Sequence, residues 1–204
     1  MLYRIFDNMS QCSEQEIARL LPLVSAQRRE QALRYQHTFG QYCCLQSYIM
    51  LCELLAEWGS IHQLPIKANP TFLYNDYGAP YIEGGPHFSI SHCKTGIAVA
   101  VSENSIGIDI EAIRTLKADL IRKTMNEDEQ KRILSSAAPD IEFIRLWTQK
   151  EALVKLQGTG IISDLHHVLD HSSEIFWTEI INQEKGYICT IAENGASSPL
   201  NSKQ

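Results

Sequence analysis

The segment Ser105-Ile-Gly-Ile-Asp109-Ile-Glu111 has isoleucine at every second position, which is the alternation of a β-strand. Side chains two apart on a strand share a face, so Asp109 and Glu111 point one way and the isoleucines the other. A buried carboxylate is costly unless it meets a cation or a cleft. The segment therefore predicts a strand that presents two acids to a cation, with a solvated strand end as the alternative.

A second segment, Trp147-Thr-Gln-Lys150-Glu151-Ala-Leu-Val-Lys155, has helical spacing and places Glu151 and Lys155 one turn apart. With the two strand acids they supply three carboxylates and a lysine. That set suits Mg²⁺ holding a phosphate, because Mg²⁺ binds few carboxylates and leaves positions for water and phosphate oxygens. The alternative for Glu151 and Lys155 is an exposed ion pair worth about 0.2–0.5 kcal/mol. Lys150 falls in the apolar stripe, so it either extends to solvent or points at a buried anion.

Length and composition are those of an ordinary globular protein. The 204 residues can form one domain or two small ones, with 44% hydrophobic and 21% charged residues. No apolar stretch reaches the length of a membrane span. The segment Met1–Asp7 has the pattern of a strand and not that of a signal peptide. No membrane association is expected.

Charge and cysteine content exclude other classes. The net charge of −6 argues against nucleic-acid binding, which needs a basic surface. Six cysteines without paired spacing favour neither a zinc site nor a disulfide framework, so a cytoplasmic location is expected. No Asp or Asn that would support Cys93 as a nucleophile can be identified in the sequence, so a thiol enzyme is disfavoured.

The coarse pattern predicts an α+β fold with a boundary between residues 104 and 105. The expected helices span residues 13–24 after a capping box, 26–36, 39–58 ending at Gly59, and later segments from 118, from 126 and over 140–156. The expected strands span residues 1–7, 71–74, 80–82, 87–91, 96–101 and 105–111, and a closing hairpin joins 175–181 to 187–192.

The two main segments, read together, resemble the 4'-phosphopantetheinyl transferases, and the chain length resembles their surfactin-type, single-chain branch. Pro86-His-Phe-Ser-Ile-Ser91-His92 resembles that branch's phosphate-binding segment, and Met125-Asn126-x-x-Glu129 resembles a helix start between the main motifs. The resemblance implies two similar α+β halves, residues 1–104 and 105–204, related by pseudo-two-fold symmetry. It also implies a monomer.

The same resemblance implies a Mg²⁺-dependent enzyme. It would transfer 4'-phosphopantetheine from coenzyme A to a serine of an acyl or peptidyl carrier protein, releasing 3',5'-ADP. The metal ligands would be Asp109, Glu111 and Glu151, and the catalytic residues Glu151, as general base, and Lys155. Coenzyme A would be bound by Arg28, Ser91, His92 and Lys155, with His92 acting as a cation on the 3'-phosphate.

The chain departs from the family pattern at three positions. Family cations fall at Gln31, near Cys43 and at Ala79, all neutral here. Lys67 or Lys94 could replace them. Two alternatives therefore stay open: a non-catalytic homologue that binds coenzyme A or a carrier protein, and another Mg²⁺-dependent enzyme that cleaves a pyrophosphate. The absence of an Arg-Glu-x-x-Glu-Glu helix disfavours a Nudix-type hydrolase.

Overall fold

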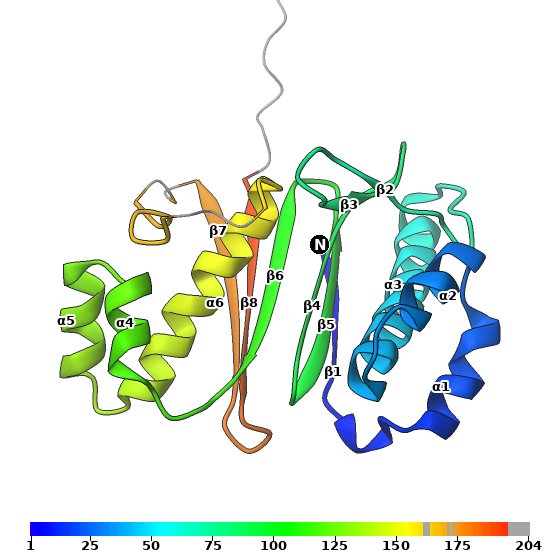
Figure 1. Ribbon diagram of the computed structural model, residues 1–204. Helices are drawn as coiled ribbons and strands as arrows, with labels where there is room; N and C mark the ends of the chain where they lie inside the picture. Colours follow the sequence, from blue (N-terminus) through cyan, green and yellow to red (C-terminus); the bar gives the residue numbers. More distant parts are fainter. Residues whose placement is uncertain (161–163, 171, 173, 196–204) are drawn as a thin grey trace, which may run out of the picture.

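The computed structural model describes residues 1–160, 164–170, 172 and 174–195. Two three-stranded antiparallel sheets lie next to each other, each with helices on its outer side (Figure 1). One sheet has the order β1 (Leu2–Phe6), β5 (Gly96–Ser102), β4 (His87–Cys93), and the other β6 (Ile106–Ala112), β8 (Tyr187–Asn194), β7 (Ile175–Asn182). The layers run helices, sheet, sheet, helices, which confirms the predicted α+β class.

The N-terminal helices cover the first sheet. They are η1 (Met9–Gln11), α1 (Glu14–Leu20), η2 (Leu21–Leu23), α2 (Ala26–Leu33) and the long, mostly buried α3 (Thr38–His62). Ser13 caps α1 by accepting from Glu16 N, but the Glu16 carboxylate binds Arg19, so the expected capping box is only half formed.

The prediction that Gly59 ends the long helix was wrong. The helix continues to His62 and ends at Gln63, whose φ is +54°. Gly59 lies inside the helix. The position favours glycine because a Cβ there would come within 2.8 Å of the Leu64 carbonyl oxygen. This glycine permits a close approach of the returning chain and does not terminate the helix.

The strands predicted at 71–74 and 80–82 shrink to a small hairpin, β2 (Leu73–Tyr74) with β3 (Pro80–Tyr81). Its turn is held by Asn75, whose side-chain oxygen accepts from Tyr77 N and Ala79 N. Asn75 Nδ2 also donates to Gly158 O at 3.0 Å, so this hairpin reaches from the first half to the helix that bears Lys155.

The second half follows its predicted elements. Helices α4 (Ala118–Thr124), α5 (Glu127–Ser135) and α6 (Pro139–Gln157) lie beside the sheet that contains β7 and β8. Asn126 and Glu129 form a reciprocal capping box at α5, and α6 ends at Gly158, whose φ is +64°. Between the two sheets, Ala98 and Ala100 pack with the β6 isoleucines and Cys189.

Both faces of β6 are therefore covered. Its isoleucines face the first sheet, while Gly107 lies against α6 so closely that an added Cβ would overlap Ala152 O and lie 2.5 Å from Leu156 N. Asp109 and Glu111 share the face of Gly107. This close packing brings the last turns of α6 to the acids.

No helix in the ranges described is long and apolar enough to cross a membrane. The division at residues 104 and 105 and the pseudo-two-fold relation stay predictions.

Gly107→Ala should lower the free energy of unfolding by about 1–3 kcal/mol or more, because the new methyl group meets backbone atoms that cannot rotate away. Chemical denaturation monitored by circular dichroism measures the change. Gly186→Asn is the matched control, because nothing lies within 4 Å of a Cβ there and asparagine tolerates its φ of +71°. Equal stability of Gly107→Ala and the wild type would contradict the close-packing interpretation.

Candidate active site

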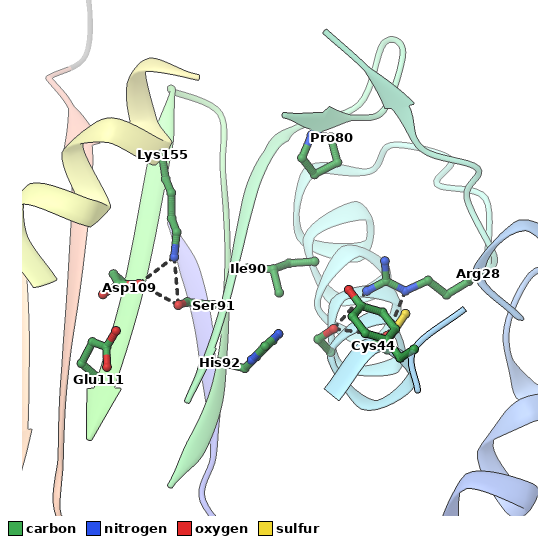
Figure 2. Close-up of a pocket in the computed structure, with 11 residues that line it drawn as sticks. Arg28, Cys44, Pro80, Ile90, Ser91, His92, Asp109, Glu111 and Lys155 are labelled. Carbon is green, nitrogen blue, oxygen red and sulfur yellow. Dashed lines mark hydrogen bonds and ion pairs between the residues drawn. The ribbon is translucent and has the colours of Figure 1, made fainter. Parts of the chain in front are cut away.

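A cavity of about 370 Å³ is lined by residues from both the first and the second half of the sequence (Figure 2). Helix α2 contributes Arg28, strand β4 contributes Ser91 and His92, strand β6 contributes Asp109 and Glu111, and helix α6 contributes Lys155. Six of the seven residues proposed from the sequence thus surround one cavity. Their roles stay predictions.

Asp109 is the most constrained side chain of the site. It is only 4% exposed, and its Oδ1 accepts from Lys155 Nζ at 2.6 Å and from Ser91 Oγ at 2.8 Å. Lys155 Nζ also donates to Ser91 Oγ and to Ile108 O. These contacts join β4, β6 and α6, so one ammonium group holds together elements from both halves of the chain.

The donor set of the site suits a hard cation. Asp109 Oδ2 is buried and has no hydrogen-bond partner among the described residues. Burial, followed by the negative charge of Asp109, raises the pKa of Glu111 and of Glu151. Carboxylate oxygens are ligands that Mg²⁺ prefers, and a cation would favour the charged form of Glu111 and Glu151 and could bind the unpaired oxygen of Asp109. The chemistry of these donors therefore suits a magnesium ion.

Glu151 is placed differently from the other two acids. It lines a second cavity of about 360 Å³, whose walls include Tyr77, Phe88, Val154 and Leu165. Within residues 1–160 and the other described segments, no three His, Cys, Asp or Glu side chains are grouped closely enough to hold a metal. For the three predicted ligands to bind one ion, their side chains would have to move toward one another, Glu151 in particular.

Arg28 is anchored by protein contacts on one side of the first cavity. Its Nε donates to Cys44 O, its Nη1 to Gln31 Oε1 and its Nη2 to Ser47 Oγ, and its guanidinium lies over the ring of Tyr48. A guanidinium carries five N–H donors, so two remain for a ligand. Arg28 is thus held in place and still able to bind an anion.

His92 lies between Arg28 and Lys155 in the cavity (Figure 2). Partial burial, followed by the positive charge of Lys155, lowers its pKa below the ordinary value of 6.5. The free ring therefore takes up a proton less readily than an ordinary histidine, and its role as a cation on a bound phosphate stays a prediction. A phosphate bound here would favour the protonated ring.

The three positions at which family cations are replaced by neutral residues lie in different surroundings. Cys43 is fully buried, and it is the neighbouring Cys44 that lines the first cavity. Gln31 binds Arg28, and Ala79 lines the second cavity. Neither Lys67 nor Lys94 is among the residues that line these two cavities. Compensation by either lysine stays a prediction.

Several lining residues were missed by the sequence analysis, namely Tyr35, Cys44, Ser47, Pro80 and Ile90. The spacing of Cys44 and Ser47, one helical turn apart on α3, was the available signal, but it has meaning only once Arg28 is known to lie beside them.

The thiol alternative gains no support. Cys93 Sγ lies 3.2 Å from Thr95 Oγ1, and burial raises the pKa of its thiol. A thiol with a raised pKa is a poor nucleophile at neutral pH.

Comparison with known proteins points to one family. A family model described as the 4'-phosphopantetheinyl transferase superfamily matches residues 105–196. The 4'-phosphopantetheinyl transferase ffp of Bacillus subtilis is 28% identical over 153 residues, 73% of this chain and 66% of that protein. The transferase psf-1 of Bacillus pumilus is 29% identical over 153 residues, 73% of this chain and 64% of that protein.

A further 4'-phosphopantetheinyl transferase of Bacillus subtilis is 30% identical over 148 residues, 70% of this chain. The matched part spans 64% of that relative's length, so the chain covers somewhat less than two thirds of these relatives. The family match contains Asp109, Glu111, Glu151 and Lys155, and the relatives' alignments extend beyond it. The chain is therefore similar to the 4'-phosphopantetheinyl transferase superfamily over residues 105–196, and to individual transferases of this name over about 150 residues.

Proposed function

We propose that this protein transfers the 4'-phosphopantetheine group of coenzyme A to a serine hydroxyl of an acyl or peptidyl carrier protein, releasing 3',5'-ADP. The observation that carries the proposal is the cavity in which Asp109, Lys155 and Ser91 meet opposite Arg28 and His92. It combines acids for a metal with cations for phosphates, in a chain whose named relatives are transferases of this kind.

The polar cavity would bind the nucleotide end of the donor. Arg28 retains two free N–H donors, and His92 would become a better cation as a phosphate approaches. Arg28 lies across the cavity from Lys155, with His92 between them, and Lys155 would contact the pyrophosphate (Figure 2). Because charge-assisted hydrogen bonds are the strong ones, these three side chains would supply most of the phosphate affinity.

Asp109, Glu111 and Glu151 would hold Mg²⁺. When bound, the ion supplies charge neutralisation of the pyrophosphate and orients it. The unpartnered Oδ2 of Asp109 and the raised pKa values of the other two acids support this assignment, because a cation would relieve both.

In the transfer, the carrier serine oxygen bonds to the β-phosphorus and the bond from that phosphorus to the bridging oxygen breaks. Glu151 would accept the serine proton, and its raised pKa makes it a stronger base than an exposed glutamate. Lys155 would stabilise the negative charge that develops on the departing 3',5'-ADP. The chemistry thus needs positioning and charge stabilisation and no covalent enzyme intermediate.

The second cavity would take the pantetheine arm. It adjoins the polar cavity, shares Pro80, Ile90 and Lys155 with it, and is lined mainly by apolar side chains. An uncharged arm next to charged phosphates matches this division. Incubation with coenzyme A, Mg²⁺ and carrier proteins from fatty-acid, polyketide and peptide synthesis, followed by intact mass, tests the function.

The same assay separates the alternatives. A phosphopantetheine adduct supports the transferase. Cleavage of coenzyme A without an adduct would indicate a hydrolase. If there is neither an adduct nor cleavage, the non-catalytic binding protein remains.

Asp109→Asn should reduce the transfer rate at least about a hundredfold, because it removes the charge that a metal and Lys155 require while keeping the shape. Intact mass spectrometry of the carrier protein measures the rate. Asp128→Asn on the exposed face of α5 is the control, because its carboxylate is exposed and pairs with Lys131, and Asp128 is not among the residues that line the two cavities. A wild-type rate for a folded Asp109→Asn variant would refute the metal-site assignment.

His92→Ala should raise the Michaelis constant for coenzyme A about tenfold, with little change for 3'-dephospho-coenzyme A, since one hydrogen bond to a charged group is lost. The His92 contribution should strengthen as the pH falls, because the pKa of the free ring is lowered and phosphate binding raises it. Steady-state kinetics with both donors between pH 5.5 and 8 checks this (about the range in which a histidine titrates). Equal losses for both donors would show that His92 does not contact the 3'-phosphate.

A further inference from the structure

Lys150 is completely buried in the middle of α6, directly before Glu151, and it lines neither cavity. Its Nζ donates to Glu129 Oε2 at 2.7 Å, to Leu165 O at 2.7 Å and to Thr124 O at 2.9 Å. Of the two readings that the sequence left open, the buried anion is correct. An ammonium has three N–H donors, and all three are used.

The charge of Lys150 is not needed merely to hold the helices together. Burying an ion pair costs desolvation free energy, and well-packed apolar residues of similar volume often stabilise a protein equally or better. What an apolar side chain cannot do is donate to a backbone carbonyl. What Lys150 contributes beyond burial is therefore its pair of hydrogen bonds to the backbone oxygens of Thr124 and Leu165, which fix the positions of these two residues.

These contacts anchor the short segment 164–166 to the junction of α4 and α5. Lys150 binds Leu165 O, and Asn126 Nδ2 donates to His166 O at 3.2 Å. Asn126 is itself fixed by Glu129, whose Oε2 accepts from Asn126 N at 2.8 Å as well as from Lys150. The capping box, the buried lysine and the segment 164–166 thus form one connected network.

Leu165 lines the second cavity together with Glu151 and Lys155. We infer that Lys150 is a positioning residue: through Leu165 O it sets the wall of the cavity that receives the uncharged arm of the donor. This inference rests on the proposed function, because that function assigns the pantetheine arm to the second cavity. Lys150 touches no reacting atom in this arrangement and acts through Leu165.

A matched pair of variants separates positioning from stability. Lys150→Met keeps a side chain of similar length but removes the donor to Leu165 O. Glu129→Gln disturbs the same buried pair, yet a glutamine amide oxygen still accepts from Lys150 Nζ, and the contact with Leu165 O remains. Both should lower the melting temperature. Only Lys150→Met should release the segment 164–166.

Three measurements are made well below both melting temperatures. Hydrogen exchange of peptides covering residues 164–170 should accelerate in Lys150→Met and stay near wild type in Glu129→Gln. The Michaelis constant for coenzyme A should rise about fivefold or more in Lys150→Met, as expected for loss of a positioning hydrogen bond, with a much smaller change in kcat. The dissociation constant for coenzyme A should rise in parallel. Equal exchange, or equal Michaelis constants in the two variants, would overturn the inference.

Asn126→Asp gives a second route if Lys150→Met does not fold. An aspartate still caps α5 but cannot donate to His166 O. It should accelerate exchange of the same peptides and raise the Michaelis constant by a smaller factor, about two- to threefold. Unchanged exchange and kinetics in this variant would count against the network.

The exchange measurement does not depend on activity. If the wild type transfers no phosphopantetheine but Lys150→Met still loosens residues 164–170, the proposed function fails and the anchoring stands. If the wild type is active and Lys150→Met changes stability alone, the positioning role fails and the proposed function stands.

Discussion

The contact between Lys155 and Asp109 is the interaction on which the site depends. It exists because Gly107 lets α6 lie against the backbone of β6, which brings the last turns of the helix to the carboxylate. Ser91 joins the contact from β4, so it also links the two sheets. A larger residue at position 107 would move the helix outward and separate all three groups. The close packing of α6 on β6 at Gly107 is therefore also what places the charged groups of the site.

Electrostatics explains how a protein with a net charge of −6 could contain the proposed phosphate site. The first cavity balances Asp109 and Glu111 against Arg28 and Lys155, so the local charge differs from that of the whole chain. Burial of carboxylates near one another raises the pKa values of Glu111 and Glu151. A bound cation would favour the charged forms of these two acids, which is consistent with the magnesium ion proposed for this site.

The two cavities differ in chemistry and share Pro80, Ile90 and Lys155 at their boundary. The side chains proposed to act in the first cavity stand on β4, β6, α2 and α6, which are regular strands and helices. The apolar cavity includes Leu165, a residue outside any helix or strand, whose backbone is fixed by Lys150. A wall formed by irregular chain needs such an anchor, because it has no ladder of backbone hydrogen bonds of its own.

Local patterns in the sequence determined most elements of this protein. The alternation of residues 105–111 predicted β6, because this signal acts within a few residues. The start of α5 near Asn126 was also expected, and there the Asn126 and Glu129 pair resembles a helix start of the family. The α+β class followed from the order of these elements. Six of the residues around the first cavity were also named in advance, from motifs that resemble a family, and their assigned roles stay predictions.

Contacts between distant segments were decided only by the tertiary structure. The sequence left open whether Lys150 reaches solvent or an anion, since its partners Glu129 and Leu165 come from other segments. It did not show that Glu151 lines a different cavity from Asp109, or that Gly59 lies within a helix against Leu64 O. Periodicity fixes which face a side chain takes on its own element, but the burial, charge partner and pKa of that side chain depend on which other element packs against that face.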